Sequence, residues 1–151
     1  MCDYSLHAIR NRLAVEGERL VVHRFRTGTI GLAPEAEVTA QAQAKAGFWR
    51  TVFGLEPKGA RPVCAVCIPP GAMLVLHGIP ARLRRQCGID ETEGVTFTQL
   101  SACENAYRDA VRFRTGHAVL LQHLEPGQLI EVLSLSSPEV VEAPVPEVVA
   151  V

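Results

Sequence analysis

The sequence predicts a mainly β domain, a small antiparallel barrel or sandwich of about seven or eight strands with one amphipathic helix at about residues 35–53. Two observations favour this fold class. Gly and Pro interrupt the chain at short intervals, and most segments between them are of strand length and rich in Val, Ile, Leu, Phe and Thr. We expect strands at residues 19–26, 29–33, 62–68, 72–77, 94–100, 108–114, 117–124 and 128–135.

The last three of these segments form the clearest local pattern. Turn residues separate them, Thr115-Gly116 after the first and Glu125-Pro126-Gly127 after the second. Gly supplies the positive φ that tight hairpin turns need, and Pro presets a turn backbone. The pattern therefore predicts a three-stranded meander over residues 108–135.

One segment departs from the strand pattern. Pro34 suits the first turn of a helix, Glu35 and Glu37 suit its positive end, and Gly54 would end it. We expect a buried stripe that closes one side or mouth of the sheet, because apolar residues recur at helical spacing. These residues are Val38, Ala42, Ala46, Trp49 and Val52/Phe53.

Composition bounds the architecture and excludes some functions. A chain of 151 residues with 48% hydrophobic residues suits one domain, which we place at 1–135, followed by an extended or disordered tail at 136–151. A net charge of −1 makes nucleic-acid binding a poor expectation, since that function favours a strongly basic surface. Charged residues, Pro or Gly interrupt every apolar run before the length of a membrane span. The sequence shows no secretory signal, so we expect a cytoplasmic protein.

The chain has five cysteines, an odd number, which without a secretory signal favours reduced thiols over a disulfide framework. Cys64 and Cys67 form a CxxC pair, but residues three apart on a strand point to opposite faces. The following Pro69-Pro70-Gly71 also prevents the helix that a thioredoxin-type site needs. We therefore expect small buried thiols, and neither a cofactor nor a metal. If a metal were bound, the candidate ligands would be Cys64, Cys67, Cys87 and His77.

Cys2 is the candidate nucleophile. Removal of Met1 would leave a free N-terminal cysteine, whose amine can accept the thiol proton as in N-terminal-nucleophile enzymes. The opening Met1-Cys2 resembles class II glutamine amidotransferases and the SRAP domains that trap abasic DNA. The resemblance covers two residues, and Asp3 stands where those families usually have Gly. It implies amide-bond chemistry at Cys2, while the alternative is an incidental second-position cysteine.

Arginines flank a repeated turn sequence. Phe25-Arg26-Thr27-Gly28 recurs as Phe113-Arg114-Thr115-Gly116. Either the segment is an internal duplication, or the same turn sequence occurs independently at two hairpins. Arg24 with Arg26, and Arg112 with Arg114, lie two apart and so share a strand face that we expect to meet solvent. If the two hairpins were adjacent, the four guanidiniums would form an anion site.

Two histidines fall within one expected strand. His117 and His123 are six residues apart, which on a continuous strand places both on the same face. That separation is about 20 Å, too long for one metal ion. We therefore interpret them as ordinary partly buried imidazoles.

The two ends of the sequence resemble a family of short uncharacterised bacterial proteins. The resemblance rests on Met1-Cys2-Asp3-Tyr4-Ser5 and on residues between Asp109 and Leu133. It implies a bacterial, non-secreted protein and no particular activity. Our leading hypothesis is a cytosolic binding module for a small anion or a protein partner, with the oligomeric state left open. The alternatives are an N-terminal-cysteine enzyme and, third, a cysteine-ligated metal protein.

Overall fold

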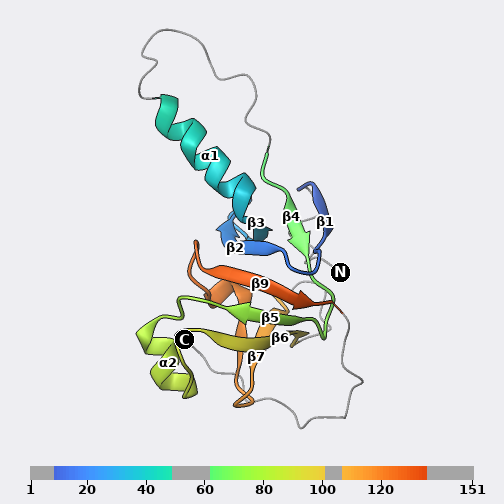
Figure 1. Ribbon diagram of the computed structural model, residues 1–151, viewed down its shortest axis with the longest axis vertical. Coiled ribbons are helices and arrows are strands. Elements are labelled where there is room, and N and C mark those ends of the chain that lie inside the picture. Colours follow the sequence, from blue (N-terminus) through green and yellow to red (C-terminus); the bar gives the residue numbers. More distant parts are fainter. Residues whose placement is uncertain (1–8, 49–61, 101–106, 136–151) are drawn as a thin grey trace.

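The computed structural model describes residues 9–48, 62–100 and 107–135 (Figure 1). Within these ranges the protein is mainly β, which confirms the predicted fold class. The elements in chain order are β1 (Asn11–Leu13), β2 (Arg19–Arg24), β3 (Ile30–Pro34), α1 (Glu35–Phe48), β4 (Ala65–Cys67), β5 (Met73–Leu76), α2 (Ala81–Cys87), β6 (Glu93–Gln99), β7 (Asp109–Phe113), β8 (Ala118–Leu120), the 3-10 turn η2 (Leu121–His123) and β9 (Leu129–Ser134).

Seven strands form one antiparallel sheet in the order β3-β2-β9-β5-β6-β7-β8. Its inner face carries the main core, because alternate residues of each strand point to the same side. The sheet is not closed into a barrel. The largest fully buried side chains of the described residues are Leu20, Leu74, Leu76, Ile79, Ile130, Val22, Val95, Val111, Val119, Val132 and Cys87.

The predicted meander over residues 108–135 is wrong in its last strand. β7 and β8 form a hairpin, but β9 pairs with β2 and β5 in the middle of the sheet. The turn before β9 docks onto β2, where Gly127 N–H donates to the Val22 carbonyl at 2.7 Å and Val22 N–H donates to the Gln128 carbonyl at 2.9 Å. The Pro-Gly signal marked a turn correctly, but a turn does not determine which strand the chain meets next.

The two edge strands β3 and β8 are linked by a side chain. Gln122, on η2 after β8, accepts a hydrogen bond from Ile30 N–H at 3.2 Å and donates one to the Ile30 carbonyl at 2.7 Å. The predicted strand at 117–124 is therefore shorter than expected, and η2 supplies this link instead. His117 and His123 do not share a strand, because His117 precedes β8 and His123 ends η2.

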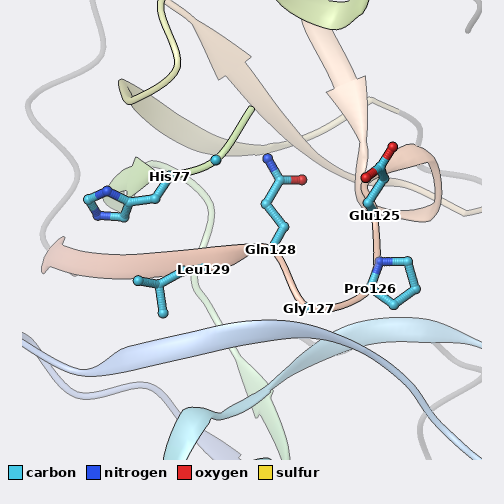
Figure 2. Close-up of a pocket in the computed structure, with 7 residues that line it drawn as sticks. His77, Glu125, Pro126, Gly127, Gln128 and Leu129 are labelled. Carbon is cyan, nitrogen blue, oxygen red and sulfur yellow. The ribbon is translucent and has the colours of Figure 1, made fainter. Parts of the chain in front are cut away.

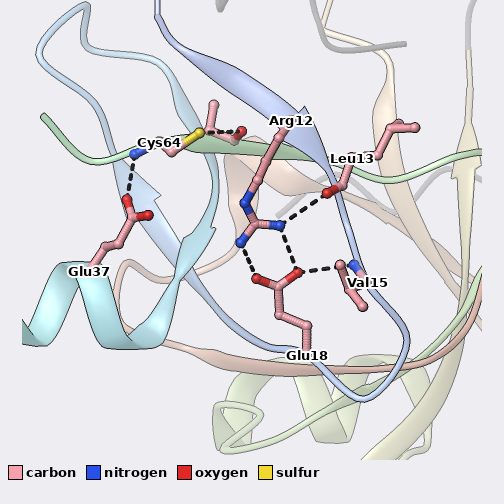
Figure 3. A network of polar contacts seen from close by, with 7 residues as sticks. Arg12, Leu13, Val15, Glu18, Glu37 and Cys64 are labelled. Atoms are coloured by element: carbon pink, nitrogen blue, oxygen red, sulfur yellow. Dashed lines mark hydrogen bonds and ion pairs between the residues drawn. The ribbon is translucent and has the colours of Figure 1, made fainter.

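A second, small sheet lies beside the first. β4 pairs in parallel with β1, a strand that the sequence did not indicate, rather than with the main sheet. β1 is tied to the start of β2 by Arg12, whose guanidinium forms an ion pair with Glu18 and also donates to the Leu13 carbonyl at 3.0 Å (Figure 3). Glu18 in turn accepts Val15 N–H at 3.0 Å. Hydrogen bonding from Arg12 lowers the pKa of Glu18 and raises the pKa of Arg12.

Helix α1 packs mainly through its beginning. Glu37 in its first turn accepts a hydrogen bond from Cys64 N–H at 2.8 Å (Figure 3), and half-buried Val38 contacts a minor apolar cluster. That cluster consists of Phe25, Ala33, Val63 and Ala65, with Ile9 and Val38 packed against it.

The rest of α1 projects away from the main sheet (Figure 1). Ala42 is exposed, so the expected buried stripe is interrupted at this position. A methyl group has little apolar area to bury, which explains why this position provides no second anchor. The side chain of Ala46 and the residues Trp49, Val52 and Phe53 lie outside the described part of the chain.

Helix α2 was not predicted from the sequence. Pro80 precedes it, and Gly88 follows it with a φ of 64°, the left-handed conformation that ends many helices. Leu83 and Cys87, four residues apart, turn into the main core. The usable helix signals in the sequence are the Pro before the segment and the Gly after it.

Candidate functional site

The four candidate arginines do not form one site. Gln122 links the β2–β3 and β7–β8 hairpins at Ile30, but their arginines do not line the same groove. Arg24 donates to the Gly28 carbonyl of its own turn at 3.3 Å, and Arg26 is exposed. Arg112 and Arg114 instead line a groove of about 590 Å³ that neither Arg24 nor Arg26 reaches.

This groove, the Arg112 groove, lies along β5, β6 and β7. Its lining residues are Met73, Asp90, Thr92, Glu93, Gly94, Val95, Thr96, Arg112, Phe113 and Arg114. Met73, Thr96 and Arg112 are cross-strand neighbours, since Met73 stands opposite Thr96 and Thr96 opposite Arg112. Gly94 leaves room beside them, because a Cβ built there meets no atom within 4 Å.

The two arginines of the groove differ in their surroundings. Arg114 is 84% exposed and forms an ion pair with Glu93 at 3.2 Å, whereas the Glu93 side chain is only 8% exposed. Arg112 is half-buried and forms no ion pair within the described residues. Its buried Nε has no hydrogen-bond partner there either. Arg112 is therefore the cation of this groove that no described residue neutralises with an ion pair.

A second hollow, the Gln128 hollow, has a volume of about 380 Å³ (Figure 2). It is lined by His77 and Gly78 after β5, by the turn residues Glu125, Pro126, Gly127 and Gln128, and by Leu129, the first residue of β9. The His77 ring contacts Thr92 of the Arg112 groove at 3.5 Å and Glu131 at 3.8 Å, so the two hollows adjoin at His77. We did not identify Gln128 from the sequence, where it follows a Pro-Gly turn with no further signal.

Cysteine chemistry differs from the expectation of reduced thiols. Cys64 and Cys87 are free and buried, whereas Cys67 is disulfide-bonded. Cys64 and Cys67 therefore do not form a disulfide with each other. An odd number of cysteines requires only that one stay unpaired, and pairing depends on spatial distances that the sequence does not contain. Burial raises the pKa of the Cys87 thiol, which opposes thiolate chemistry there.

The remaining candidates do not assemble into a site in the described structure. In this part of the chain, no group of three His, Cys, Asp or Glu side chains is placed to hold a metal ion. Cys87 lies in the main core, whereas His77 lines the Gln128 hollow. Cys2 and residues 136–151 lie outside the described residues. No helix in residues 9–48, 62–100 or 107–135 has the length and apolar character to cross a membrane.

Comparison of the chain with protein-family models, with curated proteins and with solved structures finds no match.

Proposed function

We propose that the protein is a binding module for a small ligand with a carboxylate or phosphate group, which Arg112 holds in the Arg112 groove. The observation that carries the proposal is the half-buried Arg112, which has a buried Nε without a partner and no ion pair among the described residues. A guanidinium presents a planar fork of donors that matches a carboxylate or phosphate. Partial burial strengthens such a pairing, because water screens it less.

The shape of the groove supports a small ligand. Its volume of about 590 Å³ lies within the range of about 300–1,000 Å³ typical of small-molecule sites. Gly94 leaves space next to Arg112, and the hydroxyl of Thr96 on the neighbouring strand donates to Met73 Sδ at 3.7 Å. Met73 adds an apolar contact opposite Thr96.

The acidic residues of the groove narrow the ligand class. Glu93 is already paired with Arg114, and exposed Asp90 lines the same groove. A ligand with several negative charges would meet these carboxylates at close range, which costs free energy. The groove therefore favours one anionic group on an otherwise neutral or zwitterionic molecule.

An NMR titration with acetate and inorganic phosphate tests this proposal. We expect the Gly94 and Thr96 backbone amides to shift, and Arg112→Gln to weaken binding at least tenfold, which is a change of about 1.4 kcal/mol. The matched control is Arg24→Gln, which removes the same charge from the other hairpin and should leave binding within about twofold. Equal losses in the two variants would show that only the overall charge matters and would contradict a site at Arg112.

A further inference from the structure

The side-chain amide of Gln128 is buried and forms no hydrogen bond with the described residues. The residue is 7% exposed, and neither its Nε2 nor its Oε1 has a partner among the described residues. Buried polar groups are nearly always hydrogen-bonded in folded proteins, because losing water without replacement costs free energy. Two unsatisfied atoms on one side chain beside a hollow indicate that something outside the protein completes them.

Gln122, six residues earlier, provides an internal contrast. Its Oε1 accepts the Ile30 N–H and its Nε2 donates to the Ile30 carbonyl, so both amide atoms are satisfied by one backbone residue. Both amide atoms of Gln122 are therefore hydrogen-bonded, whereas neither amide atom of Gln128 has a partner among the described residues. Gln122 also shows which partner suits a glutamine amide: a group that presents an N–H donor and a C=O acceptor side by side, as Ile30 does.

The Gln128 hollow has room for a ligand. Gly78 and Gly127 line it without side chains, and a Cβ built on either meets no atom within 4 Å. Figure 2 shows the Gln128 side chain extending between His77 and Glu125, with the Pro126–Gly127 turn beside it. The volume of about 380 Å³ suits a compact molecule rather than a polymer segment.

We propose that the Gln128 hollow binds a neutral ligand that presents an N–H and a C=O side by side, as a carboxamide, lactam or ureide does. Such an edge gives Oε1 a donor and Nε2 an acceptor at the same time. A carboxylate or phosphate offers only acceptors and would leave Oε1 facing another oxygen. Glu125 in the lining, and Glu131 beside His77, further disfavour an anion.

Access to the amide requires a small movement of Gln128. Because both polar atoms are buried, the side chain must turn by a rotamer step toward the hollow when the ligand enters. No hydrogen bond within the described structure opposes this turn. The backbone of Gln128 stays fixed, since its N–H donates to the Glu125 carbonyl at 3.1 Å and its carbonyl accepts Val22 N–H.

This site is independent of the anion site proposed above. The two hollows share no lining residue, although His77 of one contacts Thr92 of the other. Arg112→Gln should therefore leave the Gln128 hollow intact. Failure of one proposal does not imply failure of the other.

The test is an NMR titration of the full chain with 2-pyrrolidinone and acetamide, with acetate as the charged control. We expect the amide probes to shift the Gln128 side-chain NH₂ and the Gly78 and Gly127 backbone amides, with affinity on the order of millimolar for molecules of this size. Acetate should not shift these signals. Gln128→Met, which keeps length and removes the amide, should weaken the response at least tenfold, while Gln122→Met should not change it.

Thermal unfolding of the same variants separates ligand binding from a purely structural role. Gln128→Met should raise the unfolding midpoint, because an unpaired buried amide is replaced by an apolar chain of similar shape, and Gln122→Met should lower it. A lower midpoint in Gln128→Met would show that protein or ordered water satisfies the amide, and would overturn the proposal. Three further results would each overturn the proposal. They are shifts of the Gln128, Gly78 and Gly127 signals by acetate as large as those by the amide probes, unchanged binding of the amide probes in Gln128→Met, and no response to either amide probe.

Discussion

The two hairpins that carry the repeated Phe-Arg-Thr-Gly sequence share a turn but not an environment. In the first, Gly28 N–H donates to the Phe25 carbonyl at 2.9 Å, and in the second Gly116 N–H donates to the Phe113 carbonyl at 3.0 Å. Both glycines have positive φ, 85° and 92°. Four residues therefore specify the same turn at opposite ends of the sheet.

The phenylalanines of the two turns are buried on different faces. Phe113 belongs to the main core, whereas Phe25 packs in the minor cluster under α1 and β4. The arginines before them differ in the same way, because Arg24 continues the alternation of core residues on β2 and Arg112 lies opposite the core residues of β7. The comparison shows that the turn sequence fixes local backbone, while each strand's own apolar pattern fixes which side chain faces the core.

The largest expected effect comes from removing the two phenylalanines in turn. Phe113→Ala should lower the free energy of unfolding by about 3–5 kcal/mol, since it opens a cavity in the main core. Phe25→Ala should cost less, about 2 kcal/mol, because its cluster is small and can collapse onto the space. Urea unfolding of both variants measures the difference. Equal losses would mean that burying a phenylalanine ring in the minor cluster stabilises the protein as much as burying one in the main core.

Breaking the link between the hairpins should have the next largest effect. Gln122→Leu removes both hydrogen bonds to Ile30. The Ile30 N–H and carbonyl then lose these partners at the edge of β3. The expected loss is about 1–2 kcal/mol, limited because Gln122 is only half-buried and water can enter. Amide hydrogen exchange at Ile30 should accelerate. An unchanged exchange rate would show that the edges stay together without this side chain.

The sequence predicted the strands well because their signals are local. Turn residues and alternating apolar residues placed β2, β3, β5, β6, β7 and β9 within a few residues of their observed bounds. The pairing of β9 with β2, and of β4 with β1, depends on contacts between distant segments that no local pattern encodes. That is why the meander was wrong although each of its three strands exists.

The candidate sites were predictable to a smaller extent. Arg112 and Arg114 line one groove that includes neither Arg24 nor Arg26, and the spacing of the four arginines in the sequence did not indicate this division. Gln128 carried no signal, since an unpaired amide is visible only when its neighbours in space are known. Residue type indicates what chemistry is available, and topology decides what is brought together.

Smaller effects should show that the two turns are equivalent. Gly28→Ala and Gly116→Ala should each lower stability by about 1 kcal/mol, because an L-residue is strained at positive φ. Sterics do not add to this cost, since a Cβ at either position meets no atom within 4 Å. Thermal unfolding of both variants should therefore give nearly equal losses. A clear inequality would show that the repeated sequence does not form energetically equivalent turns.

The smallest expected effect distinguishes the ion pairs at the two hairpins. Glu18, just before β2, has a lowered pKa because Arg12 hydrogen-bonds to it, so its contribution is present above the ordinary carboxyl value of 4.5 and is lost as pH falls through the lower folded value. Glu18→Gln should cost up to about 1 kcal/mol at pH 7 and less at pH 3, measured by urea unfolding. Arg114→Gln should also lower stability at pH 7, because the Glu93 side chain is only 8% exposed and would lose its ion-pair partner. A cost of Glu18→Gln that is the same at both pH values would contradict the ionic role of Glu18, because only the charged carboxylate gains from Arg12.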